Sequence, residues 1–159
     1  MPIFEYVSEQ YQLVQSSRTA LFDYCKTVSI NDFVNENSSF GRGGSMRNLL
    51  VHVANVYEFW IANKTLNKAI IFTSYPSQQN IDDVVNLFAE VDSIMSEFIN
   101  LFKEPGLKQI EYEINGVRSS TGLLKLFTHV VTHEFHHKGQ ILSISRQLGY
   151  TPVDTDIIR

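Results

Sequence analysis

Five histidines carry the most suggestive chemistry in this chain, and they are confined to two segments. His52 lies in the first segment, whereas His129, His133, His136 and His137 crowd the second. If the second segment is an α-helix, His133 and His137 lie one turn apart on the same face. Two imidazoles at this spacing can bind one metal ion, as in the helical His-x-x-x-His of zinc enzymes.

The apolar residues of the second segment indicate which of its histidines face inward. At about 100° per residue, these apolar side chains fall between roughly +20° and +80° from His133. They are Leu126, Val130, Ile141, Ile144 and Leu148. His137 lies at about +40° and His133 borders the stripe, whereas His129 and His136 lie at roughly −40° and −60°. We therefore expect His133 and His137 to point into the core, and the other two to be supporting or surface groups.

His52 supplies the third imidazole, because it shares an apolar helical face with Leu49, Val53 and Val56. Three inward histidines predict a site for one divalent metal ion per chain, bound by His52, His133 and His137. His129 is the first substitute ligand. A buried histidine can also be satisfied by a hydrogen bond to a carbonyl group, so a purely structural helical protein stays open as an alternative.

Acidic residues near the histidines do not complete a protease site. Glu134 follows His133 as the general base does in the H-E-x-x-H motif, but the third ligand of a protease is not recognisable. By helical phase, neither Glu134 nor Glu58 aligns with its neighbouring histidine. We therefore assign no catalytic residue and no organic cofactor.

Three histidines leave a coordination position open for water or substrate, which is typical of catalytic zinc. This favours a metal-dependent enzyme that acts on a small-molecule substrate. A non-catalytic metal-binding or stress-response module, in which the metal is structural or sensed, is the alternative. Three imidazoles suit zinc or nickel, with iron as a further candidate.

Composition excludes several classes of protein. The net charge is −4 and the basic residues are scattered, so nucleic acid is not an expected partner. Cys25 is the single cysteine, which rules out an intramolecular disulfide. No stretch approaches the roughly 20 apolar residues that span a bilayer, and the first residues do not resemble a signal peptide. We expect a cytoplasmic protein without membrane contact.

Two helices are predicted in the first half of the chain from apolar residues at helical spacing. The first covers residues 4–25, although Arg18 interrupts its apolar stripe. Residues 29–45 are polar and rich in glycine, which predicts a loop. Ser45 is the expected N-cap of the second helix, which contains His52 and leads into a long connection.

Two more helices are predicted in the second half. One opens near Asn80 and ends before Pro105-Gly106. Residues 109–120 alternate apolar and polar side chains around Asn115-Gly116, which predicts a short hairpin. The last helix should start after a capping cluster at Ser119–Thr121 and end near Leu148. The sequence thus predicts an all-α four-helix bundle, a single domain over residues 1–159.

Two segments resemble the DinB/YfiT-like proteins. THVVTHEFHHKGQILSISRQLG, residues 128–149, is similar to the last helix of that family, whose pattern is close to H-x-x-N-H-x-x-H-H-R-G-Q. SMRNLLVHVANVYEFWI, residues 45–61, resembles its second helix. Thr132 and Lys138 depart from the usual Asn and Arg, and both are expected to be supporting or surface positions.

The resemblance implies more than the residues alone. It implies an up-down-down-up bundle, a homodimer, and metal ligation by His52, His133 and His137. It also implies a transferase or isomerase that uses a low-molecular-weight thiol such as bacillithiol or mycothiol. Hydrolysis by a metal-bound hydroxide is the other reaction type, and it is expected from the open coordination position alone. Independently of the resemblance, we expect one or both of the loops that carry Arg42 and Arg118 to border the mouth of the site, where an arginine would attract an anionic substrate. The alternative is that both arginines are solvated loop residues.

Overall fold

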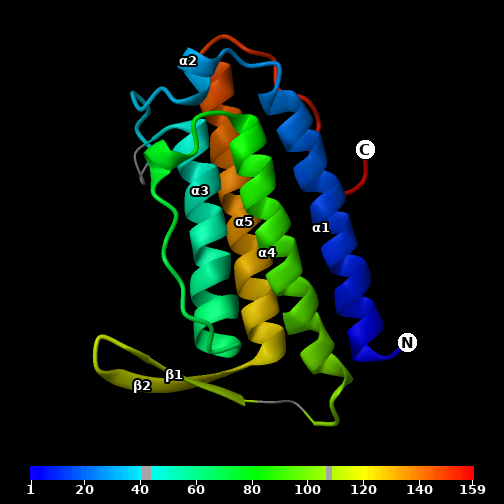
Figure 1. Ribbon diagram of the computed structural model, residues 1–159. Helices are drawn as coiled ribbons and strands as arrows, with labels where there is room; N and C mark the ends of the chain where they lie inside the picture. The colour runs from blue at the N-terminus through cyan, green and yellow to red at the C-terminus, as the bar shows by residue number, and fades with distance from the viewer. Residues whose placement is uncertain (41–43, 107–108) are drawn as a thin grey trace.

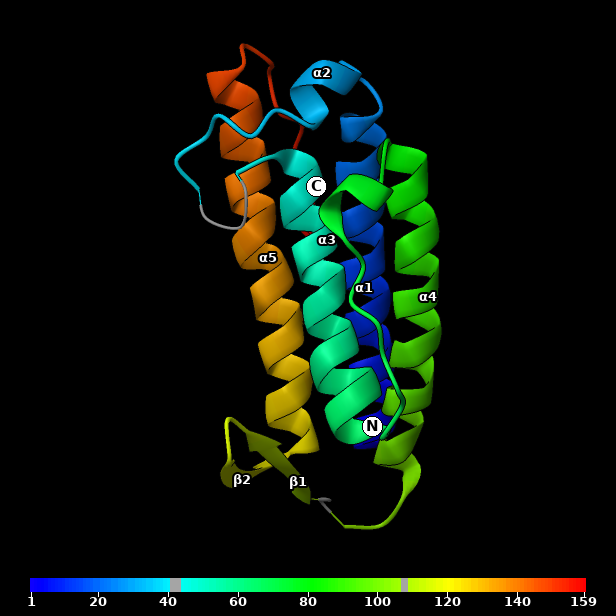
Figure 2. The ribbon, with the colours of Figure 1, turned by 60° about the vertical axis from the view of Figure 1, so that its left-hand side comes forward.

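The computed structural model describes residues 1–40, 44–106 and 109–159, and most of them are helical. Four long helices of this part of the chain lie side by side (Figure 1). They are α1 (Ile3–Cys25), α3 (Met46–Tyr57), α4 (Ile81–Asn100) and α5 (Leu123–Gln147). Figures 1 and 2 show that α1 and α5 run in one direction, whereas α3 and α4 run in the other.

The connection between α3 and α4 is long because these helices run in the same direction. A π-helical segment, Glu58–Thr65, continues α3, and the chain then returns along the helices to the start of α4 (Figure 2). We call residues 66–80 the return connection. It contains one short 3-10 turn, Tyr75–Ser77. A second 3-10 turn, Leu101–Lys103, follows α4.

Side-chain caps fix the starts of α3 and α4, at the predicted N-cap Ser45 and at Asn80, near which the sequence predicts a helix to open. The backbone N–H of Asn48 donates to the Ser45 hydroxyl oxygen at 2.9 Å, which caps α3. At α4, the Asp83 N–H donates to Asn80 Oδ1 at 3.0 Å, and the Asn80 N–H donates to Asp83 Oδ2 at 3.3 Å. This reciprocal pair is a capping box.

The predicted hairpin precedes α5. Strand β1 (Gln109–Ile114) pairs antiparallel with β2 (Val117–Gly122), and Ile114 lies opposite Val117. The two turn residues, Asn115 and Gly116, have φ values of 51° and 77°. Positive φ at both positions is what a two-residue turn needs to match the strand twist, and Asn-Gly satisfies it at low cost.

Two predictions about local structure are wrong. Ser119–Thr121 do not cap the last helix, because they are paired in β2 and α5 starts at Leu123 directly after Gly122. The predicted loop over residues 29–45 contains a short helix, α2 (Ile30–Phe33), whose N-cap Ser29 accepts a hydrogen bond from the Asp32 N–H. Phe33 of α2 is buried in the core, so this turn of helix closes one end of the protein.

The core lies between the four long helices and contains most of the predicted apolar stripes. Its largest fully buried side chains include Tyr57, Phe88, Phe98, Phe127 and Met95. Arg18 is 3% exposed, so the residue that interrupts the α1 stripe lies inside the core. Among the described residues, no helix has both the length and the apolar character that crossing a membrane requires.

Candidate metal centre

The structure brings His52 of α3 together with His133 and His137 of α5. One nitrogen from each imidazole lies within 4.8 Å of the other two. The ring centroids are 5.0 Å apart for His52 and His133, 4.8 Å for His52 and His137, and 4.5 Å for His133 and His137. His137 is buried and the other two are half-buried. The three rings therefore converge on one point near the surface of the α3–α5 pair.

The spacing of the two α5 imidazoles suits a shared metal ion. His133 Nε2 and His137 Nε2 are 3.2 Å apart. Bonds of 2.0–2.1 Å from a tetrahedral zinc ion put neighbouring nitrogens about 3.3 to 3.4 Å apart. The observed separation is close to this value, so the residues present fit a bound metal.

Gln140 orients the His137 ring. His137 Nδ1 lies 2.7 Å from Gln140 Oε1, and Gln140 Nε2 lies 3.2 Å from His136 Nε2. The amide oxygen can only accept, so Nδ1 of His137 carries the proton and Nε2 presents its lone pair towards His133. Metal-bound histidines usually donate their other N–H in this way.

The protonation state of His133 is compatible with a cation shared between the rings. Burial, together with the imidazoles of His137 and His52, lowers the pKa of His133 to about 3, so this ring is neutral at physiological pH. Its Nδ1 is buried without a hydrogen-bond partner among the described residues. If Nδ1 carries the proton, the Nε2 lone pairs of His133 and His137 face each other at 3.2 Å, which a cation between them would stabilise.

The other two histidines of α5 lie at the surface, as the helical phase predicts. His129 and His136 are exposed. The His129 ring packs against Trp60, with centroids 5.6 Å apart, and its centroid is 6.1 Å from that of His133. His129 is thus adjacent to the three converging histidines without belonging to that group.

Glu134 is part of a buried ion-pair network and is not positioned as a general base. Arg18 of α1 donates to its two oxygens at 2.8 and 2.9 Å, and the Tyr57 hydroxyl of α3 donates to Oε2 at 2.6 Å. Arg18 also donates to Asp92 of α4 at 2.7 Å, and Tyr11 Oη donates to the same carboxylate at 2.6 Å. These five side chains join α1, α3, α4 and α5, and we call them the Arg18 network.

Sequence reasoning missed the Arg18 network, although one signal for it was present. Arg18 lies within the apolar stripe of α1, and Glu134 borders the stripe of α5 at about 100° from His133. A cation on one inward face and an acid on another are the pattern of a buried pair. Nothing in the spacing of one helix identifies the partner on another.

Lys138, expected at a supporting or surface position, is buried. Its side chain is 6% exposed, and its ammonium group donates to Ser17 Oγ and to the Thr155 carbonyl oxygen, the latter at 3.0 Å. The same group lies 3.6 Å from the centroid of the Phe135 ring. Burial lowers the pKa of Lys138 to about 8. This residue ties α5 to α1 and to the C-terminal segment.

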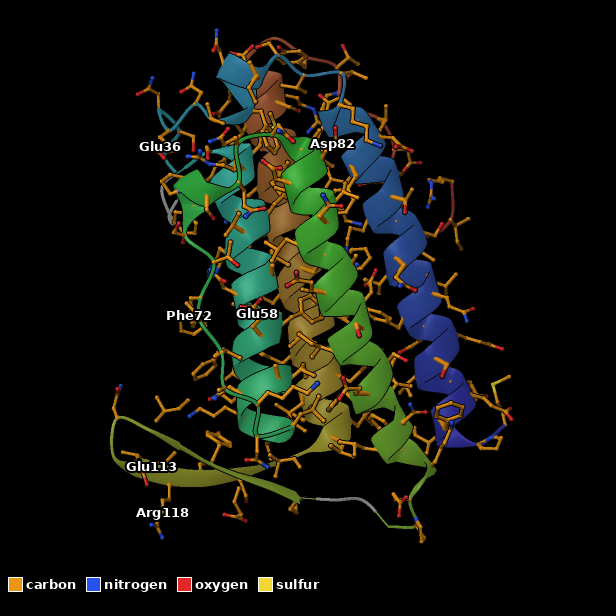
Figure 3. The ribbon with its side chains drawn as sticks, viewed as in Figure 1. Glu36, Glu58, Phe72, Asp82, Glu113 and Arg118 are labelled. Atoms are coloured by element: carbon orange, nitrogen blue, oxygen red, sulfur yellow. The ribbon has the colours of Figure 1, made fainter. Side chains whose placement is uncertain are left out.

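Glu58, the other acid near the histidines in sequence, interacts with α4. Burial raises the pKa of its carboxyl group, and the nearby carboxylate of Glu90 raises it further. Glu58 Oε2 is buried and has no hydrogen-bond partner among the described residues. Figure 3 shows Glu58 on the side of α3 near α4. The interactions of Glu58 among the described residues are thus with the α4 side of the protein.

A cavity opens beside His52. It has a volume of about 440 Å³ and is lined by His52, Asn55 and Phe59 on one side and by Phe72, Thr73 and Tyr75 of the return connection on the other. We call it the His52 pocket. Asn55 holds the connection in place, because its amide donates to the Thr73 carbonyl oxygen at 2.9 Å and accepts from the Thr73 N–H at 3.0 Å. Phe72 lies along the outside of α3 (Figure 3).

Of the two arginines predicted at the mouth, Arg118 is among the described residues, and it does not lie at this pocket. Arg118 lies on the hairpin with Glu113 (Figure 3), its side chain is 88% exposed, and its Nε lies 3.3 Å from Glu113 Oε2. It does not line the His52 pocket. Arg42 lies outside the described residues.

Comparison with known proteins supports the resemblance seen in the sequence. The sequence model of the DinB family matches residues 1–159. The chain is also similar to the uncharacterized protein YizA of Bacillus subtilis (strain 168). The two are 25% identical over 150 residues, which covers 89% of this chain and 87% of YizA.

Proposed function

The chain belongs to the DinB family, and we propose that it binds one divalent metal ion through His52, His133 and His137 and acts as a metal-dependent enzyme. The observation that carries this proposal is the convergence of three imidazole nitrogens, from two helices, within 4.8 Å of one another. Zinc or nickel suits such a donor set, and iron is a further candidate.

The enzyme reading is supported by access to the histidines. His52 lines an open pocket of about 440 Å³, a size that is ordinary for small-molecule sites. A metal held by three histidines would act as a Lewis acid and lower the pKa of a coordinated water or thiol. We therefore propose transfer of a low-molecular-weight thiol to an electrophile, or hydrolysis, as the reaction type.

The chain's own residues have separate roles in this proposal. Gln140 holds the proton of His137 on Nδ1 and so directs Nε2 towards the shared point. Asn55 holds the return connection against α3 and keeps the His52 pocket in shape. The Arg18 network fixes α5, which carries two ligands, against the other three helices.

A non-catalytic metal-binding or stress-response module is the second candidate, and one observation favours it. Glu134, which follows the ligand His133, is bound by Arg18 and Tyr57 inside the core and is therefore not available as a base for a substrate. Cobalt substitution separates the two candidates, because its visible spectrum responds to coordination. An enzyme requires the spectrum to change with azide or a small thiol, whereas an unchanged spectrum favours the module.

The remaining proposals rest on family membership and on the length and composition of the chain. We infer that the four long helices form one up-down-down-up four-helix bundle, a single domain over residues 1–159. We also infer a cytoplasmic homodimer that acts on a small-molecule substrate. Sedimentation of the purified protein tests the dimer directly.

Metal content of histidine variants tests the site. His52→Ala, His133→Ala and His137→Ala should each abolish stoichiometric loading in elemental analysis of natively purified protein. His129→Ala and His136→Ala are matched controls on the same helix, and they should keep most of the metal because both side chains are exposed. A His136→Ala variant that loses metal while His133→Ala retains it would contradict the assignment.

A further inference from the structure

A second cavity lies close to His133, between the π-helical segment, the hairpin and α5. It has a volume of about 210 Å³ and is lined by Trp60, Tyr112, Thr121, Lys125, Leu126 and His129. We call it the Trp60 pocket. Its volume is below the roughly 300 Å³ at which pockets for drug-sized ligands begin. It therefore suits a small group.

Aromatic rings form the walls of the Trp60 pocket. The Trp60 and Tyr112 ring centroids are 5.2 Å apart at an interplanar angle of 87°. The Trp60 and His129 centroids are 5.6 Å apart at 81°. Rings that meet edge to face in this way present flat apolar surfaces around a cavity, and a planar group is the shape that packs best between them.

The π-helical backbone contributes to the position of Trp60. A π-helix has more residues per turn than the α-helix that precedes it, so it changes the direction of the side chains that follow α3. Trp60 is left half-buried beside the hairpin and not enclosed in the core. Short π-helical segments inside α-helices are found frequently at functional sites.

The charge of the pocket is positive. Lys125 is the charged side chain in its lining, and no acidic residue lines it. Within residues 1–40, 44–106 and 109–159, Lys125 forms no ion pair. The hydroxyl groups of Tyr112 and Thr121 add polar atoms that can bind an anion. A cation above aromatic walls selects a planar group with a negative charge.

The Trp60 pocket adjoins the three converging histidines through His129. The His129 ring lies between Trp60, at 5.6 Å, and His133, at 6.1 Å. We propose that the Trp60 pocket binds the planar, aromatic part of an anionic substrate, whose charge is paired by Lys125. That this ligand is the substrate of the metal centre rests on the proposed function. The binding site itself does not depend on the metal.

Trp60 is the single tryptophan of the chain, so tryptophan fluorescence comes from a residue that lines this pocket. The probes are benzoate and its neutral isostere benzamide, titrated into the full-length protein after chelation, so that no carboxylate can bind a metal. Benzoate should change the Trp60 fluorescence saturably and bind more tightly than benzamide. Lys125→Met should remove this preference, a loss of up to about fivefold in benzoate affinity. Lys26→Met, another exposed lysine far from the pocket, should leave it unchanged.

A second variant tests the aromatic wall. Tyr112→Leu keeps an apolar side chain but removes the ring, and it should weaken benzoate and benzamide alike, by about two- to tenfold. No saturable change with either ligand at millimolar concentration would overturn the proposal, as would equal affinities that Lys125→Met leaves unaltered. His52→Ala should bind benzoate like the wild type. Metal loading without benzoate binding would support the metal centre and refute the Trp60 pocket. Benzoate binding without metal loading would support the Trp60 pocket and refute the metal centre.

Discussion

Replacing Arg18 should be among the most damaging single substitutions in this protein. Its guanidinium group is 3% exposed, donates twice to Glu134 and once to Asp92, and lies 4.6 Å from the Phe88 ring centroid. Burial opposes the charge, but the Glu134 carboxylate raises the pKa of Arg18 well above its ordinary value. Arg18→Met keeps most of the apolar volume and leaves Glu134 charged inside the core.

The size of the effect follows from the burial of the partner. Glu134 is 7% exposed and would keep only the hydrogen bond from Tyr57, whereas the Asp92 side chain is 32% exposed and can be hydrated. Removing one member of a buried pair costs about 3 to 5 kcal/mol. For a chain of this size that corresponds to a fall of about 6 to 20 °C in melting temperature.

Urea unfolding followed by circular dichroism, with metal removed, measures this cost. The double variant R18M/E134L should be more stable than R18M alone, because it no longer buries an unpaired charge. Lys26→Met is the control, since Lys26 pairs with Asp23 at the surface and should lose at most about 1 kcal/mol. A loss below about 1 kcal/mol for R18M would refute the reasoning, as would a double variant that loses the sum of the two single losses.

Three further predictions concern the metal centre. Chelation should lower the melting temperature, because metal at a hundredfold excess over Kd adds about 2.7 kcal/mol to the free energy of unfolding. The helical circular dichroism at room temperature should survive, because the fold has its own core. A metal-free protein that is unfolded at room temperature would contradict this. Gln140→Leu should weaken metal binding by about 10- to 100-fold in a competition assay with a chromophoric chelator, because His137 loses the acceptor that orients it; an unchanged affinity would show that Gln140 does not position the ring. In the metal-free protein, the His133 pKa of about 3 lies below the ordinary value of 6.5. Between pH 6.5 and about pH 3, the unfolded chain therefore binds a proton at His133 that the folded protein does not bind. The free energy of unfolding should fall as the pH falls through this window. Urea titrations at several pH values should show a shallower pH dependence for His133→Gln than for the wild type, and an unchanged one for His136→Gln. Equal slopes in the wild type and both variants would refute the lowered pKa of His133.

Much of the arrangement around the histidines could be predicted from the sequence, because helical phase is a local property. The apolar stripe of one helix indicates that His133 and His137 face inward and that His129 and His136 do not, and the structure agrees. Caps and turns are equally local. Ser45 and the Asn115-Gly116 pair needed no knowledge of the rest of the fold.

What could not be predicted depends on contacts between distant segments. The Arg18 network joins residues that are 74 and 116 positions apart, and helical phase in α1 contains no information about α4 or α5. Lys138 is expected at a supporting or surface position from its helix alone, but the C-terminal segment covers it through Thr155. Ser119–Thr121 have cap-forming side chains, but pairing with β1 satisfied their backbone groups first.

One wall of the His52 pocket and the helices that carry the three histidines are held in place by different parts of the protein. The three histidines lie on helices whose positions the core fixes, whereas one wall of the His52 pocket consists of a partly exposed strap held at Thr73 by two hydrogen bonds to Asn55. Substitutions at exposed positions usually change stability by less than about 0.5 kcal/mol. Phe72, which is 53% exposed, can therefore vary without loosening the helices that carry the histidines. The parallel course of α3 and α4 thus gives this protein a pocket wall whose residues can change while the helices that carry the three histidines keep their positions.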